Sequence, residues 1–200
     1  MVARRWDLQV AERFHLLLKE LGKRFDRKIT GINLPETAVE FGNKKDLHPP
    51  GFTFEVYKNA IKENMRIAKE AFPNTVIIQY ANFMPDEWLP SEDHSYMRDL
   101  FQYAKQIHVG MEGPDILVYK KGQMSNSYQF VKQCAGIIPT GLAVQDGNYA
   151  HINPQTGKEV TFPEIYIFGK EYLKLNYIFW CTEEPYYSTR LLSFLRGLKE

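Results

Sequence analysis

The feature that most restricts the fold of this chain is a repeated switch between the hydrophobic period of a helix and that of a strand. Apolar residues recur at three- and four-residue steps in segments that we predict to be helices. These segments lie near residues 8–21, 54–72, 91–104, 127–135, 161–175 and 191–198. Five short apolar segments between them are predicted strands, at residues 29–34, 75–80, 108–111, 139–144 and 177–181. Strands that are apolar on both faces and separated by helices predict a parallel sheet with right-handed crossovers.

Two kinds of parallel sheet fit this order of elements. One is an open doubly wound sheet, which begins with a strand and carries a glycine-rich first turn when it binds nucleotides. The other is the part of a (β/α)8 barrel from its fourth strand onward. The chain opens with a helix and contains no G-x-G-x-x-G or Walker pattern. We therefore predict an α/β fold, a partial TIM barrel of five parallel strands in sequential order with outer helices, as a single domain over residues 1–200. An open α/β domain that binds a small anion is the weaker alternative.

Composition excludes several classes of function. Twenty-five Lys and Arg residues are balanced by 24 Asp and Glu residues, so the chain lacks the basic field that nucleic-acid binding requires. No apolar run approaches the roughly 18–20 residues that span a bilayer, so we expect no membrane partner. The first residues lead into an amphipathic helix and not into a signal peptide, which makes the cytoplasm the default location. The five histidines and two cysteines show no ligand spacing, so we predict no metal and no cofactor.

The longest predicted loops, residues 36–51, 82–90 and 146–160, all follow strands. They therefore lie at the carboxyl ends of the strands, where α/β folds hold their ligands. Each strand is followed by polar or aromatic residues. In chain order these are Asn33 and Glu36; Gln79, Tyr80 and Asn82; Glu112 and Asp115; Gln145, Asp146 and Asn148; and Trp180, Glu183 and Glu184.

This set of side chains suits a carbohydrate. Acids and amides hydrogen-bond sugar hydroxyls, and aromatic faces stack on the C–H surfaces of a sugar ring. Two carboxyl groups facing each other could also cleave a glycosidic bond, one as general acid and the other as nucleophile or base. We select Gln79, Asn82, Asp115, Gln145, Trp180 and Glu184 as candidates for substrate binding.

The segments ITGINLPETAVEF, QYANFMP, HVGMEGPDI, GLAVQDGNYA and YIFWCTEEPYY resemble the strand ends of (β/α)8 glycoside hydrolases of the retaining β-glycosidase clan. The resemblance covers nearly the whole chain, but only the part of such a barrel that follows its third strand. It implies an acid/base glutamate after the barrel's fourth strand, which falls on Glu36. It also implies a nucleophilic glutamate after the seventh strand and an aromatic residue on the eighth, which falls on Trp180.

The chain departs from that pattern at two positions. Pro35 stands where the family usually has an asparagine before its acid/base glutamate. The strand expected to carry the nucleophile ends in Gln145 and Asp146, without a glutamate. The second catalytic carboxylate is therefore left open between Asp146 and the pair Glu183 and Glu184.

Ordinary structural roles compete with these assignments. Asp115 and Asp146 lie in common turn sequences, Glu183 and Glu184 could begin a helix, and Trp180 could belong to the core.

The predicted function is a glycoside hydrolase-like domain that acts on or binds a carbohydrate. The alternative is a catalytically inactive carbohydrate-binding or interaction fragment. A partial barrel has unpaired sheet edges, so we also expect the chain to associate with itself or with a missing N-terminal half-barrel.

Overall fold

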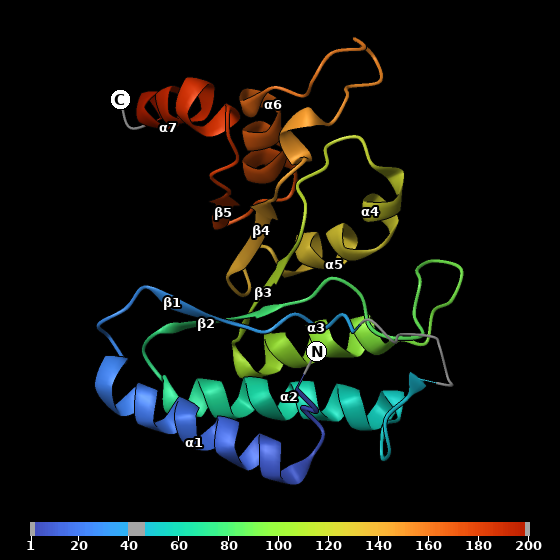
Figure 1. Cartoon of the computed structure of the whole chain (residues 1–200), viewed down its shortest axis with the longest axis vertical. Helices are drawn as coiled ribbons and strands as arrows, with labels where there is room; N and C mark the ends of the chain where they lie inside the picture. The colour runs from blue at the N-terminus through green and yellow to red at the C-terminus, as the bar shows by residue number, and fades with distance from the viewer. Residues whose placement is uncertain (1–2, 40–46, 199–200) are drawn as a thin grey trace.

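The computed structural model describes residues 3–39 and 47–198. It contains one sheet of five parallel strands in the order β1-β2-β3-β4-β5 (Figure 1). The strands are β1 (Gly31–Leu34), β2 (Val76–Tyr80), β3 (Gly110–Gly113), β4 (Thr140–Val144) and β5 (Tyr177–Trp180). The sequential order confirms the predicted half-barrel and excludes the open doubly wound sheet, in which the strand order reverses in mid-sheet.

Helices precede β1 and connect the strands. They are α1 (Leu8–Phe25), α2 (Phe54–Ala71), α3 (Tyr96–Ile107), α4 (Lys121–Ser125), α5 (Ser127–Cys134), α6 (Phe162–Ile167) and α7 (Leu192–Gly197). A 3-10 turn at Asn148–Ala150 and π-helical turns at Phe168–Tyr172 and Tyr187–Leu191 complete the set. The short helix α4 was not predicted from the sequence.

The prediction that the third helix begins at residue 91 was wrong. Helix α3 begins at Tyr96, and its first amides are capped by Glu87, a residue of the preceding loop. The Glu87 carboxylate accepts hydrogen bonds from the backbone amides of Tyr96 (3.0 Å) and Met97 (2.8 Å). A carboxylate nine residues before Tyr96 thus satisfies backbone amides at the start of the helix.

The apolar stripe of α1 is only partly buried. Leu18 is buried, whereas Val10 and Leu17 are 37% and 51% exposed. Helix α1 packs against α2, with Gly22 directly beside the backbone of Ala71. It lies at the outer margin of the half-barrel, so the rest of its stripe has no neighbouring helix among the described residues (Figure 1).

The two faces of the sheet differ in composition. The face toward the helices is apolar and buried, and includes Leu34, Ile77, Met111 and Leu142. The opposite face, which we call the inner face, is the concave side of the half-barrel. Gly141 lies on this face next to the Phe179 ring of β5. A Cβ at residue 141 would lie 2.9 Å from that ring, so a larger residue would collide with it.

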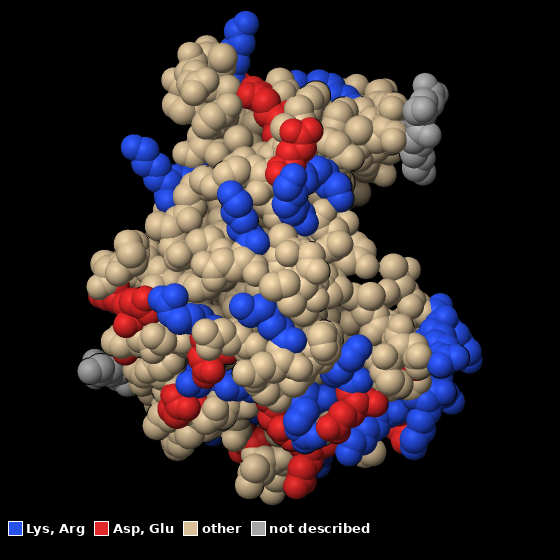
Figure 2. Space-filling model, turned by 180° about the vertical axis from the view of Figure 1, so that it is seen from behind, with Lys and Arg blue, Asp and Glu red and all other residues tan. Residues whose placement is uncertain are grey.

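The outer surface carries both signs of charge in close mixture. Figure 2 shows lysine, arginine and acidic side chains interspersed over the part of the molecule that contains α1 to α3. The same view shows an indentation on one side, between this part and the part that carries β5 and α7. In the part of the chain that the structure describes, no helix combines the length and the apolar character needed to cross a membrane.

Candidate functional site

The inner face carries a buried carboxyl group near its carboxyl edge. Glu112 lies in β3 and is only 3% exposed. The side-chain amide of Asn33, in β1, reaches across β2 and donates a hydrogen bond to Oε2 of Glu112. Burial raises the pKa of Glu112 to about 7, and the hydrogen bond from Asn33 only partly opposes this rise. Glu112 is therefore suited to hold and release a proton near neutral pH.

Tyr80, at the end of β2, lies beside this carboxyl group and two others. Its hydroxyl accepts a hydrogen bond from Nε2 of Gln145, at 2.7 Å. Burial raises the pKa of the Tyr80 phenol, and the negative charges of Glu36, Glu112 and Asp115 raise it further. Carboxyl groups from the ends of β1 and β3 thus lie close enough to this phenol for their charges to act on it.

The loop after β1 holds Glu36 at this edge. Oε1 of Glu36 accepts a hydrogen bond from Nδ2 of Asn82 at 3.0 Å, and the side chain is half-buried. The Arg5 guanidinium donates to the backbone oxygen of Glu36 and to the Tyr57 hydroxyl (3.0 Å). Tyr57 in turn donates to the backbone oxygen of Thr37 at 2.9 Å. The segment before α1 and the helix α2 therefore both fix the position of this loop.

Two further predicted residues serve the same edge in different ways. Gln79 is 1% exposed, and its amide donates to the backbone oxygens of Pro35 (2.7 Å) and Tyr80 (2.8 Å). It therefore ties β2 to the loop that carries Glu36. Asp115 lies in a left-handed turn with φ of 56°, and its Oδ1 accepts a hydrogen bond from Nδ2 of Asn148 at 3.0 Å.

A second group forms at the ends of β4 and β5. A carboxylate oxygen of Asp146, the Sγ of Cys181 and a carboxylate oxygen of Glu183 lie within 4.8 Å of one another. The backbone amide of Gly147 donates to Glu183 at 2.9 Å. Carboxylate oxygens and a thiol sulfur are atom types that can bind metal ions. The spacing of histidines and cysteines in the sequence does not indicate this group, because its members come from the ends of two different strands.

The remaining two predicted residues have structural contacts of their own. Glu184 is exposed, and its carboxylate accepts hydrogen bonds from the hydroxyl (2.5 Å) and the amide (3.3 Å) of Ser188. The Trp180 ring packs against Phe162 of α6 and Phe194 of α7, with centroid distances of 6.3 and 6.1 Å. It therefore lies on the helix side of β5, opposite the inner face.

Four residues of the inner-face site were recognised in the sequence as strand-end residues but were not selected as candidates. They are Asn33, Tyr80, Glu112 and Asn148. A signal for Glu112 exists in the sequence. It is a charged residue directly after the predicted strand at residues 108–111, and it shares the inner face with Gly110 by period-two alternation.

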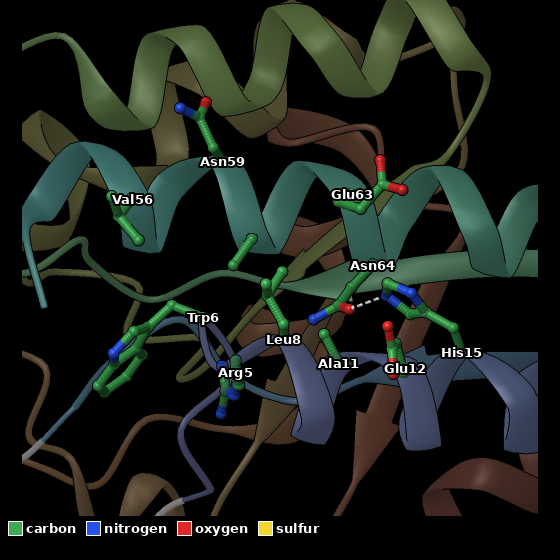
Figure 3. Close-up of a pocket in the computed structure, with 11 residues that line it drawn as sticks. Arg5, Trp6, Leu8, Ala11, Glu12, His15, Val56, Asn59, Glu63 and Asn64 are labelled. Carbon is green, nitrogen blue, oxygen red and sulfur yellow. Dashed lines mark hydrogen bonds between the residues drawn. The ribbon is translucent and has the colours of Figure 1, made fainter. Parts of the chain in front are cut away.

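A cavity of about 370 Å³ lies outside the sheet, between α1 and α2 (Figure 3). Glu12, Glu63, His15 and Asn64 are among the residues that line it. Nε2 of His15 and Oδ1 of Asn64 are joined by a hydrogen bond of 2.8 Å. Arg5 lines this cavity and also bonds the loop that carries Glu36.

No family model and no curated protein matches this chain. Among solved structures, it is similar to GH10 from Paenibacillus barcinonensis, with 14% sequence identity and a TM-score of 0.45. The match covers 89% of this chain and 57% of that structure, so the chain spans little more than half of its length. The half-barrel described above rests on the strand order of this chain itself.

Proposed function

We propose that the carboxyl edge of the inner face binds a carbohydrate and hydrolyses a glycosidic bond. The observation that carries the proposal is a set of hydrogen bonds at this edge, from Asn33 to Glu112, from Asn82 to Glu36 and from Gln145 to Tyr80. Carboxyl, amide and phenol groups on one concave face offer the donors and acceptors that a sugar ring needs. The sequence resemblance to the retaining β-glycosidase clan supports the same class of substrate.

The residues take separate roles in this proposal. Glu36 is one of the two reacting carboxyl groups, and Asn82, Asp115 and Gln145 hydrogen-bond the sugar hydroxyls. Gln79 is a positioning residue, because its amide is occupied by backbone oxygens.

The ends of β4 and β5 border the same edge. Gln145, which bonds Tyr80, directly precedes Asp146, so we assign Asp146 and Glu183 to a neighbouring part of the sugar site. Trp180 and Glu184 are left outside the proposed site because the helices α6 and α7 and Ser188 already contact them.

The open edges of the sheet favour a second candidate function. In the described part of the chain, β1 and β5 each pair on one side only. A partner half-barrel or a second copy of this chain would cover these edges and enclose the inner face. In this case the chain alone binds carbohydrate without turning it over.

Activity on a panel of aryl glycosides, together with calorimetric titration of oligosaccharides, tests the proposal. We expect turnover by the wild-type chain, and a loss in kcat on the order of 10² or more in the Glu36→Gln variant. Glu171→Gln, which changes an exposed glutamate on the π-helical turn after α6, is the matched control and should retain full activity.

Binding without turnover would support the second candidate. A chain that neither binds nor hydrolyses any glycoside would contradict both candidate functions.

A further inference from the structure

We propose that Glu112 is the carboxyl group that delivers the proton to the departing sugar oxygen, and that Asn33 positions it. This inference rests on the proposed function and reassigns the acid role, which the sequence resemblance implied for Glu36, to a residue two strands away.

The geometry distinguishes the two glutamates. Glu112 is buried on the inner face and uses Oε2 for the bond from Asn33, which leaves Oε1 for a proton and a ligand. Among the described residues, no lysine or arginine forms an ion pair with Glu112. A buried carboxyl group without a cationic partner favours its neutral, protonated form.

Glu36 differs from Glu112 in exposure. It is half-buried in the loop after β1, and the amide of Asn82 donates a hydrogen bond to its carboxylate. Two carboxyl groups at one site, one buried and one open to solvent, are the arrangement in which one acts as acid and the other as nucleophile or base.

The titratable groups that share the site with Glu112 come from three strands. Tyr80 belongs to β2, Glu36 follows β1, and Asp115 follows β3. The end of β4 contributes the neutral amide of Gln145, which bonds Tyr80. Burial keeps the Tyr80 phenol protonated at neutral pH, so it serves as a hydrogen-bond donor and not as a competing acid.

The step is balanced with water as the only co-reactant. The bond between the anomeric carbon and the leaving oxygen breaks, and the leaving oxygen takes the proton from Oε1 of Glu112. The oxygen of a water molecule forms the new bond to the anomeric carbon, either directly or after the Glu36 carboxylate has attacked. The proton that water releases restores the protonated state of the carboxyl pair.

The dependence of turnover on the leaving group tests this assignment. A dinitrophenyl glycoside needs no protonation of its leaving group, whereas an alkyl glycoside does. In Glu112→Gln we expect kcat on the alkyl glycoside to fall by about 10²–10⁴ and kcat on the dinitrophenyl glycoside to fall by less than about tenfold. Glu36→Gln should lose turnover on both substrates.

The pH dependence of kcat/KM tests the role of Asn33. In the wild type, the fall in rate on the alkaline side should follow the ionisation of Glu112, whose pKa is about 7. Because the Asn33 bond lowers this pKa, Asn33→Ala should move the alkaline fall to higher pH. Glu87→Gln, which alters an equally buried glutamate at the start of α3, should leave the profile unchanged.

Infrared difference spectra provide a readout that needs no substrate. The carbonyl stretch of protonated carboxyl groups should contain a component in the wild type near pH 6 that is lost as the pH rises through about 7 and that is missing from the spectra of Glu112→Gln.

A folded Glu112→Gln variant that keeps full turnover on alkyl glycosides would overturn this inference and leave the proposed function intact. An ionised Glu112 near pH 6 would do the same. A wild-type chain that neither binds nor hydrolyses any glycoside would overturn both.

Discussion

At the scale of single residues, three glutamates show that position decides what a carboxyl group does. Glu36 is half-buried and bonded by an amide, Glu87 is buried and caps a helix, and Glu112 is buried on the inner face. Burial raises the pKa of both Glu87 and Glu112. Only Glu112 combines this rise with a place in the concave site.

The raised pKa of Glu112 links stability to pH. Between about pH 4.5 and 7, the folded state keeps a proton on Glu112 that the unfolded state has released. The favourable contribution of this group is therefore complete below about pH 4.5 and is lost as the pH rises through about 7. The whole change is on the order of 3 kcal/mol.

We expect Glu112→Gln to lose less stability than the wild type between about pH 5 and 8, because glutamine cannot ionise. Urea unfolding at several pH values measures the difference, with Glu171→Gln as the exposed control. Parallel stability curves for the wild type and Glu112→Gln would show that Glu112 does not titrate in this range.

At the scale of elements, close approach between helices outweighs intrinsic helix preference. Gly22 lies inside α1, where alanine is favoured over glycine by about 1 kcal/mol. A Cβ at this position would lie 2.1 Å from the backbone oxygen of Ala71 in α2. Because backbone cannot move aside as a flexible side chain does, α1 and α2 would have to separate.

Gly22→Ala should therefore lower the free energy of unfolding by about 1–3 kcal/mol, since overpacking exceeds the gain in helix preference. The matched control is Gly122→Ala in α4, where a Cβ would meet no atom within 4 Å. We expect this control to be neutral or to raise stability by up to about 1 kcal/mol. Urea unfolding of the two variants makes the comparison, and equal effects would contradict the packing argument.

At the scale of the whole molecule, the half-barrel leaves both ends of its sheet open. The edge strand β1 follows α1, whose apolar stripe is partly exposed, and β5 forms the other edge. Unpaired backbone groups beside apolar side chains favour association with another chain.

We expect the wild-type chain to self-associate with increasing concentration, as measured by size exclusion with light scattering. Leu17→Lys, on the exposed stripe of α1, should weaken this association. Ile137→Lys is the control, because Ile137 is similarly exposed (56%, against 51% for Leu17) and lies before β4 instead of on α1. A stable monomer at all concentrations would contradict the expectation for self-association.

Most of the architecture could be predicted from the sequence. The alternation of helical and strand periods, and the polar residues that follow each strand, are local patterns, and right-handed crossovers leave few ways to arrange parallel strands. The five strands and their order were accordingly predicted correctly. Boundaries failed where a distant group decided them, as when Glu87 capped α3.

The partners of individual side chains were decided by the tertiary structure alone. Asn33 and Glu112 are 79 residues apart in the chain and meet only because the sheet curves and brings β1 and β3 together on one face. The stripe of α1 resembles a core stripe in the sequence, but the end of the half-barrel leaves part of it uncovered. Hydrophobic period depends on neighbours in the chain, whereas burial and the pKa of a carboxyl group depend on neighbours in space.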